Sequence, residues 1–268
     1  MPTIKVGRIN ISYLREGAGG TPIILIAGLS MDKEFWAPVV EHLKHQYECI
    51  SYDNRGVGES SRPRSGYTPD DMMQDTVGLM DKLSIPRAHI VGCSMGGRSA
   101  QLMALRTPDR VAGLVLMGSM ASRDHRSSHV MKVRSILQRR LSRYEYSLFV
   151  ASWFFGPKAL AKPGFAEDWA KKEAEKPHPQ SLHAFDQIVA GGGKLDLRGE
   201  LKNIRKPTLV MVGEDDILTP PYQSRVLAEK IPGAELLILP GVGHFCVLED
   251  PKGSADPIAS FLKRVEGR

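Results

Sequence analysis

The chain has 268 residues and a hydrophobic fraction of 42%, which is ordinary for one large globular domain, with or without an insertion. Its longest apolar runs, such as Ile23-Ile24-Leu25-Ile26-Ala27, are far shorter than the ~18 residues that a membrane-spanning helix needs. The net charge is +6, and the segment 122–143 accounts for it, with seven basic residues against one acidic residue. No nucleic-acid-binding motif accompanies this charge, so we expect no nucleic-acid partner and no membrane partner.

The cysteines and the amino-terminal residues bear on the compartment. Strand-like alternation begins at Ile4 without a recognisable signal or transit peptide, which predicts a cytoplasmic protein. Cys49, Cys93 and Cys246 are an odd number of cysteines without metal-ligand spacing, which suits a reducing compartment and a fold without disulfides. We expect no metal, no cofactor, and a monomer or a homodimer.

Strand and helix patterns alternate in two parts of the chain. The predicted strands lie at 4–15 (a β-hairpin), 22–27, 47–52, 88–91, 111–117, 208–212 and 234–239. The predicted helices lie at 35–43, 67–83, 98–106, 221–230 and 251–265. Such alternation is typical of an α/β fold with a mostly parallel sheet covered by helices on both faces.

The alternation stops near Gly118. From there to Gly193 the pattern is helical, and no convincing strand interrupts it. We therefore predict an α/β core formed by 1–118 and 194–268, with residues 119–193 as a helical cap inserted between its two parts.

One short stretch carries a nucleophile's signature. Ser94 stands in Gly92-Cys93-Ser94-Met95-Gly96, directly after the predicted strand 88–91 and before a predicted helix. A strand that turns at once into a helix strains its middle residue and needs small neighbours two positions away on each side. The serine hydroxyl is thereby exposed at the end of a strand, beside a helix N-terminus.

A serine nucleophile needs a base, and the base needs an acid to orient it. Functional groups in α/β sheets lie in loops after the carboxyl ends of strands, and two later loops supply candidates. The loop after 234–239 contains His244, and the loop after 208–212 contains Asp215 and Asp216. We prefer Asp216, the fourth residue in Gly-x-x-Asp-x-x-x-Pro, and expect Asp215 to cap the turn or face solvent. The order Ser, Asp, His is the one expected of this fold.

These motifs, taken together and in this order, resemble those of the α/β-hydrolase superfamily over essentially the whole chain. Within it, the sequence is most similar to small capped enzymes of the 3-oxoadipate enol-lactonase, aminoacrylate-hydrolase and carboxylesterase type. The matching elements are 23–29, Asp53-Asn54-Arg55-Gly56-Val57-Gly58-Glu59-Ser60, Gly92-Cys93-Ser94-Met95-Gly96-Gly97, 213–220 and Gly241-Val242-Gly243-His244-Phe245.

The resemblance implies a mechanism and further site residues. Ser94 would attack a carbonyl, His244 would carry its proton, and Asp216 would orient the imidazole, while backbone N–H groups of Leu29 and Met95 would form the oxyanion hole. In the loop of Leu29, relatives often carry His-Gly where this chain has Ala27-Gly28. The backbone donor survives that change, but any hydrogen bonds of the histidine are lost.

The implied activity is hydrolysis of an ester or lactone of a small to medium organic molecule through an acyl-enzyme. Three alternatives remain: a carbon–carbon bond hydrolase with the same triad, a cofactor-free haloperoxidase or acyltransferase, and a ligand-binding homologue without turnover. Cys93 is expected to be an inert buried thiol. Haloalkane or epoxide opening is disfavoured, because those relatives carry Asp in place of Ser94.

The predicted cap bears on the substrate. Its aromatic residues cluster at 144–169, and we expect Trp153, Phe154 and Phe155, together with Phe245, to line an apolar pocket. The basic segment 122–143 has two interpretations. We favour a solvated basic face, and the alternative is attraction of an anionic, carboxylate-bearing substrate.

Overall fold

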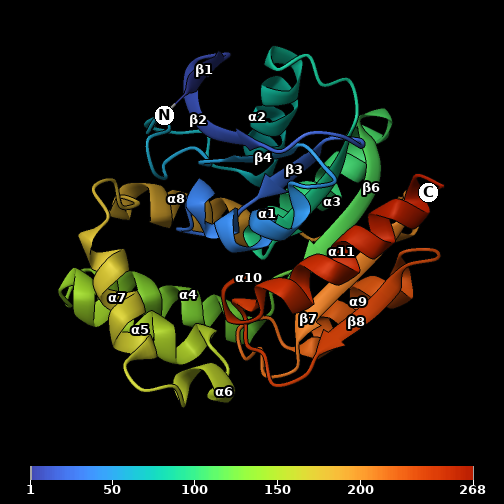
Figure 1. Cartoon of the computed structure of the whole chain (residues 1–268). Helices are drawn as coiled ribbons and strands as arrows, with labels where there is room; N and C mark the ends of the chain where they lie inside the picture. The colour runs from blue at the N-terminus through green and yellow to red at the C-terminus, as the bar shows by residue number, and fades with distance from the viewer. Residues whose placement is uncertain (1, 268) are drawn as a thin grey trace.

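The computed structural model describes residues 2–267 and is built on an eight-stranded, mostly parallel sheet with the order β1-β2-β4-β3-β5-β6-β7-β8 (Figure 1). The strands are β1 (Thr3–Val6), β2 (Ile9–Glu16), β3 (Ile23–Ile26), β4 (Cys49–Tyr52), β5 (Ala88–Cys93), β6 (Val111–Met117), β7 (Thr208–Gly213) and β8 (Glu235–Leu239). Pairing is antiparallel for β1 with β2 and for β2 with β4, and parallel for all other neighbours. The predicted α/β class is confirmed.

Helices cover both faces of this sheet, and each face has its own hydrophobic core. The first core joins side chains of the central strands to α1 and α11, and the second joins the alternate side chains to α2, α3 and α9. Figure 1 shows α1 and α11 in front of the sheet. The bounds are α1 (Ala37–Leu43), α2 (Pro69–Lys82), α3 (Met95–Arg106), α9 (Pro221–Lys230), α10 (Cys246–Glu249) and α11 (Pro251–Val265).

The chain between β6 and β7 forms helices, as the pattern of 119–193 predicts. They are α4 (His125–Gln138), α5 (Arg143–Phe154), α6 (Pro157–Leu160), α7 (Phe165–Glu175) and α8 (Leu182–Gly193). Figure 1 shows α4 to α7 together at the lower left, whereas α8 lies beside α1. Ser122 and Asp196 form an isolated antiparallel bridge, so the chain enters and leaves this insertion at one place. We call residues 119–193 the insertion from here on.

Three helix starts differ from the predicted bounds. The helix predicted over 35–43 begins at Ala37, directly after a 3-10 helix over Lys33–Trp36. The helix predicted over 67–83 begins at Pro69, because Thr68 and Asp71 form a reciprocal capping box. The Thr68 hydroxyl accepts from the Asp71 N–H at 3.1 Å, and the Asp71 carboxylate accepts from the Thr68 N–H at 2.9 Å. The helix predicted over 98–106 begins earlier, at Met95, directly after the Ser94 turn.

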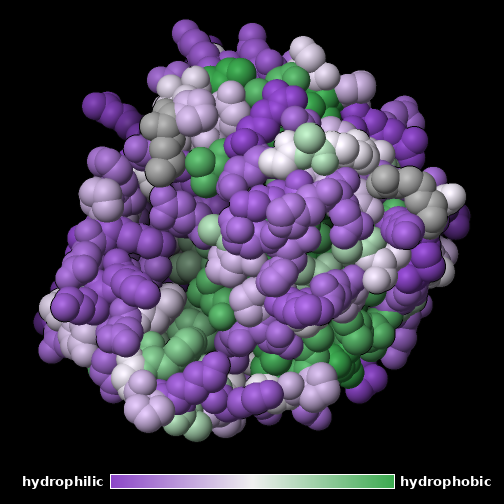
Figure 2. All heavy atoms as spheres, in the orientation of Figure 1, coloured by the Kyte–Doolittle hydropathy of each residue, from purple (hydrophilic) through white to green (hydrophobic). Residues whose placement is uncertain are grey.

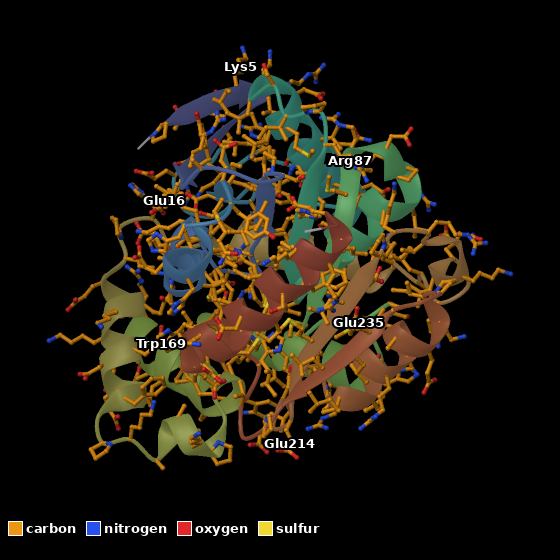
Figure 3. The ribbon with its side chains drawn as sticks, turned by 45° about the vertical axis from the view of Figure 1, so that its right-hand side comes forward. Lys5, Glu16, Arg87, Trp169, Glu214 and Glu235 are labelled. Atoms are coloured by element: carbon orange, nitrogen blue, oxygen red, sulfur yellow. The ribbon has the colours of Figure 1, made fainter. Side chains whose placement is uncertain are left out.

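The insertion packs on the core through aromatic side chains. Trp169 of α7, labelled in Figure 3, lies 5.8 Å from the ring of Phe245, which belongs to the core. Figure 2 shows hydrophobic surface concentrated in the lower half of the molecule, while the upper half is mostly hydrophilic. Among residues 2–267, no helix is both long and apolar enough to span a membrane.

Candidate active site

Ser94 occupies a strained turn between β5 and α3. Its φ of 54° and ψ of −114° place it in a left-handed region that side-chain-bearing residues rarely adopt. A Cβ at Gly92 would lie 2.5 Å from the Gly96 carbonyl oxygen, and a Cβ at Gly96 would clash with the Ile26 carbonyl oxygen. The turn therefore requires glycine on both sides of Ser94.

The neighbouring strand β6 and the residues after it hold this turn in place. The Ser94 N–H donates to the carbonyl oxygen of Met117 at 2.8 Å, and the Ser119 hydroxyl donates to the Ser94 carbonyl oxygen at 2.9 Å. Both partners lie at or just after the end of β6, the strand adjacent to β5. The sheet thus over-determines a backbone conformation that would otherwise relax.

His244 and Asp216 form a buried pair at the same edge of the sheet. His244 Nδ1 lies 2.7 Å from Asp216 Oδ2, and each residue is 2% exposed. Asp216 Oδ1 accepts from the N–H groups of Leu218 at 2.9 Å and Thr219 at 2.8 Å. Asp215 is half-buried, and the carboxylate that meets the imidazole belongs to Asp216.

Thr219 also belongs to this cluster, and the sequence reasoning did not single it out. Its hydroxyl lies 2.6 Å from Asp216 Oδ2, 3.1 Å from His244 Nδ1 and 2.8 Å from the Gly118 carbonyl oxygen. A hydroxyl carries one proton, so it donates to one oxygen at a time. The available signal was its position three residues after Asp216, which is typical of a local side-chain turn.

A cavity of about 70 Å³ brings Ser94 and His244 together in one lining. Among residues 2–267 no hydrogen bond joins the Ser94 hydroxyl to the imidazole. Hydrogen bonds between a nucleophile and its base are often long without substrate and shorten in the reactive complex. The backbone thus places the Ser94 and His244 side chains at one pocket, without a hydrogen bond between them.

Leu29 and Met95 line the same pocket. A Cβ at Gly28 would lie 3.3 Å from the Ser94 Cβ, so the loop of Leu29 passes directly over the serine. The Asn54 side chain donates to the Ala27 carbonyl oxygen at 3.2 Å and anchors that loop. Met95 is the first residue of α3, where the helix dipole favours negative charge.

Two of the four aromatic residues predicted to line the pocket do so. Phe154 and Phe245 line the pocket, but Trp153 and Phe155 do not, so the expectation for these two was wrong. Successive helical residues point about 100° apart, and Trp153 accordingly turns away and packs against Phe149 at 6.0 Å.

Phe155 instead packs in the hydrophobic core that joins the insertion to the α/β core. Its ring lies 4.8 Å from that of Phe165 and 5.2 Å from that of Trp169, both edge to face. Its ring also lies 5.4 Å from that of Phe245, so Phe155 contacts a residue of the pocket lining without belonging to the lining itself.

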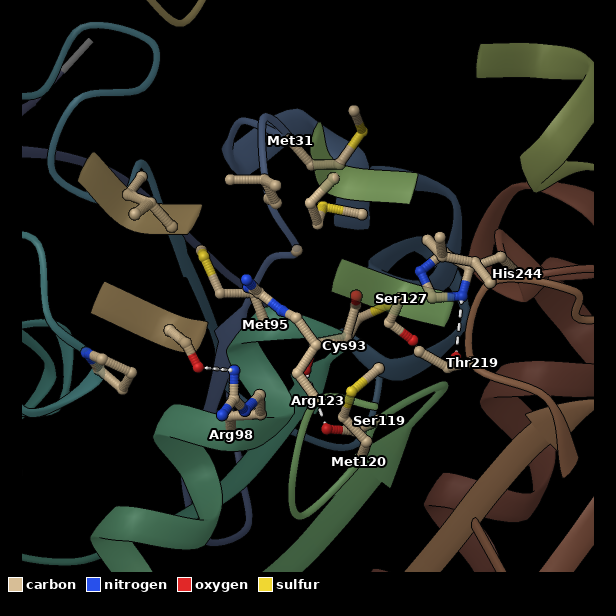
Figure 4. Close-up of a pocket in the computed structure, with 18 of the residues that line it drawn as sticks. Met31, Cys93, Met95, Arg98, Ser119, Met120, Arg123, Ser127, Thr219 and His244 are labelled. Atoms are coloured by element: carbon tan, nitrogen blue, oxygen red, sulfur yellow. Dashed lines mark hydrogen bonds between the residues drawn. The ribbon is translucent and has the colours of Figure 1, made fainter. Parts of the chain in front are cut away.

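The basic segment is divided between pocket and solvent. Arg123 and Arg134 line the pocket, and so does Arg98 of α3 (Figure 4). Arg126, Lys132, Arg139 and Arg140 are exposed. Arg143, the seventh base of the segment, is exposed as well. The favoured interpretation, a solvated face, therefore holds for these five residues and is wrong for Arg123 and Arg134. In Figure 4, His244 and Thr219 lie at the right of the pocket, and Arg98 and Arg123 lie to their left.

The buried thiols near the site are poor nucleophiles. Burial raises the pKa of Cys246 to about 12 and raises the pKa of Cys93 well above its ordinary value. A thiol reacts as its thiolate, which burial disfavours. Within the described part of the chain, no group of three or more His, Cys, Asp or Glu side chains is placed to hold a metal ion.

Comparison with known proteins identifies the family of the chain. The family model described as the alpha/beta hydrolase fold matches residues 21–251, and the chain belongs to this family. A relative from Caulobacter sp. (strain K31), named "Putative carbamate hydrolase RutD", is 31% identical over 253 residues, covering 90% of each chain.

Two solved structures extend the comparison. The enol-lactonase from Burkholderia xenovorans LB400 superimposes with a TM-score of 0.88 at 28% identity, covering 98% of this chain and 100% of its own. A thermophilic esterase from Thermogutta terrifontis, solved with malate bound, has a TM-score of 0.87 at 25% identity, with 99% of each chain covered. Family and neighbours together indicate hydrolytic activity on a small molecule.

Proposed function

We propose that the protein is a serine hydrolase that cleaves a carboxylic ester or lactone through an acyl-enzyme, with Ser94, His244 and Asp216 as its catalytic triad. One observation carries this proposal. The buried Asp216–His244 pair, at 2.7 Å, opens onto the cavity that also exposes Ser94 from its strained turn. A nucleophile, a base and an orienting acid thus share one site.

Each side chain has a role in the proposed reaction. The Ser94 hydroxyl attacks the carbonyl carbon while His244 accepts its proton through Nε2 and later delivers it to the leaving alcohol. Asp216 accepts the Nδ1–H hydrogen bond and stabilises the imidazolium that forms. The N–H groups of Leu29 and Met95 stabilise the negative charge on the carbonyl oxygen, and each such donor contributes about 10²–10³ in rate. Water then releases the acid by the reverse sequence.

The names of the relatives support acyl chemistry without agreeing on a substrate. A carbamate, an enol-lactone and an ester each contain a carbonyl carbon that a serine can attack. The pocket in this chain is enclosed by the insertion, which contributes Met131 and Phe154 to its lining. We propose that the insertion, residues 119–193, is a cap that restricts the size of the acyl group.

The test is hydrolysis of a chain-length series of p-nitrophenyl esters by the wild type and by Ser94→Ala. We expect multiple turnovers by the wild type, which a ligand-binding homologue would not show. Ser94→Ala should lower kcat by about 10⁶ while thermal melting shows a retained fold. Activity retained by the variant would overturn the proposal. Cleavage of a diketone without ester turnover would favour the carbon–carbon hydrolase instead.

A further inference from the structure

The pocket beside Ser94 has an unbalanced charge. Three guanidinium groups line it, those of Arg98, Arg123 and Arg134, and among the described residues its lining contains no Asp or Glu. Buried charges in proteins are normally paired, because removing an ion from water without a partner is costly.

Arg98 lies on α3 and is 5% exposed. Its Nη1 and Nη2 donate to the carbonyl oxygens of Gly192 at 2.7 Å and Leu195 at 2.8 Å, while its Nε is buried without a partner in the described chain. Burial, followed by the charge of Arg123, lowers the pKa of Arg98 to about 10. The charge of Asp196 acts to raise the pKa of Arg98 and is the smallest of the three causes. The Asp196 carboxylate is exposed and forms its ion pair with Arg198.

The guanidinium of Arg123 lies beside that of Arg98, and both contact the carboxyl-terminal end of α8. Its Nη1 donates to the Val189 carbonyl oxygen at 2.8 Å. A Cβ at Gly192 would lie 3.2 Å from Arg123 Nη2 and also 3.2 Å from Arg98 Nη1, so the two guanidinium groups are close to each other. The carbonyl end of a helix carries about half a negative charge, which is less than two full positive charges. Capping α8 thus leaves the pair electrostatically unbalanced.

Arg134 enters the pocket from α4 and is 2% exposed. Its Nε donates to the Tyr146 hydroxyl at 3.0 Å, and its guanidinium lies 4.9 Å from the Phe154 ring and 5.3 Å from the Phe185 ring. Aromatic rings attract a cation but leave its charge uncompensated. The hydroxyl of Tyr67, in the same lining, is also buried without a hydrogen-bond partner in the described chain.

We propose that Arg98, Arg123 and Arg134 form a cationic subsite that binds a carboxylate at the far end of the acyl group, so that the preferred substrate is an anionic ester or lactone derived from a short dicarboxylic acid. This inference rests on the proposed function and adds its substrate class. A planar guanidinium matches a carboxylate in shape and donors. Arg98 follows Ser94 by four residues, a rise of about 6 Å along α3, so a short carbon chain can connect the two sites.

The test compares substrates that differ only in charge: monomethyl esters of dicarboxylic acids and methyl alkanoates of equal chain length. We expect the wild type to have a kcat/KM for the charged series at least about tenfold higher. Arg123→Gln and Arg134→Met should each lower kcat/KM for the charged esters about 10- to 100-fold, the range for loss of a charge-assisted hydrogen bond. They should change the neutral esters only a few-fold.

The control is Arg140→Gln, which removes an exposed arginine outside the pocket lining and should leave both series unchanged. Equal use of charged and neutral esters by the wild type would overturn the subsite, as would an unchanged preference in folded Arg123→Gln and Arg134→Met.

A separate measurement keeps this inference distinct from the proposed function. Turnover of neutral methyl esters tests the hydrolase alone. If no ester is cleaved, binding to Ser94→Ala is measured by thermal shift with monomethyl adipate and with dimethyl adipate. Stabilisation by the monoester alone, lost when Arg123→Gln is added, would support the subsite without catalysis. Equal effects of both esters, or none, would overturn it.

Discussion

The two sides of the pocket are built on opposite principles. On the core side, the charge of Asp216 is met completely, by the imidazole of His244 and by the N–H groups of Leu218 and Thr219. On the other side, the guanidinium of Arg123 donates to a backbone carbonyl oxygen, and among residues 2–267 it contacts no carboxylate. The acid of the first side is paired within the protein, whereas the described residues that line the second side include three arginines and no Asp or Glu.

This difference suggests how the two sides divide the work. Groups that carry out a reaction act best when they are already oriented, because reorganisation during the reaction is costly. Groups that select a substrate can keep an unmet charge that the substrate supplies. The core side therefore accounts for the proposed chemistry, and the arginine side accounts for the proposed specificity.

The largest effect is expected from a change to Asp216, on the core side of the pocket. Asp216→Asn retains the shape of the acid but removes the charge that orients His244, and an amide in its place favours the wrong imidazole tautomer. We expect kcat for a neutral ester to fall by about 10⁴. Asp215→Asn is the matched control and should change kcat only a few-fold, because the carboxylate that contacts the imidazole belongs to Asp216. A larger loss in Asp215→Asn would reverse the assignment of the acid.

A smaller effect is expected from a change to Thr219, whose hydroxyl contacts Asp216. Thr219→Val removes the hydroxyl that lies between Asp216 and the Gly118 carbonyl oxygen and leaves one of them without its hydrogen bond. We expect a decrease of about tenfold in kcat with little change in KM, since Thr219 positions the acid rather than binding the acyl group.

Thr219→Ser separates this role from packing. It keeps the hydroxyl and loses only a methyl group, so it should recover most of the activity that Thr219→Val loses. If the serine variant were as slow as the valine variant, side-chain packing would explain the loss and the hydrogen bond would not.

The core side could be predicted from the sequence because its signals are local. Ser94 is marked by glycines two positions away, and Asp216 and His244 each follow an apolar run that predicts a strand. The pairing Ser94–His244–Asp216 then follows from the common edge of parallel strands.

The arginine side could be predicted only in part, as the alternative in which the basic segment 122–143 attracts an anionic substrate, because its contacts join distant parts of the chain. Arg98 bonds to Gly192, 94 residues away, and nothing beside Arg98 in the sequence indicates that partner. The misplaced Trp153 and Phe155 have a similar cause. Both lie in the predicted aromatic cluster, but small rotations at the end of α5 decide which ring reaches the pocket.

Asp124 is the sequence neighbour of Arg123, but unlike that arginine it is surrounded by hydrogen-bond partners for its charged group. Its carboxylate caps α4 by accepting from the Ser127 N–H at 2.7 Å, and it accepts from the Tyr222 hydroxyl and from Gln223 Nε2 of α9. Burial acts to raise the pKa of Asp124, but the hydrogen bonds from Tyr222, Ser127 and Gln223 outweigh it and lower the pKa below its ordinary value.

A lowered pKa in the folded state predicts stability that is present above the unfolded pKa, near 3.9, and lost as the pH falls through the folded value. Tyr222→Phe should therefore lower the free energy of unfolding by about 1 kcal/mol at neutral pH, and by less near pH 3, as measured by urea unfolding. In an Asp124→Asn background the effect of Tyr222→Phe should no longer depend on pH. A pH-independent loss in the wild-type background would mean that Tyr222 acts through packing. The charge of Asp124 would then contribute nothing to the contact between the insertion and α9.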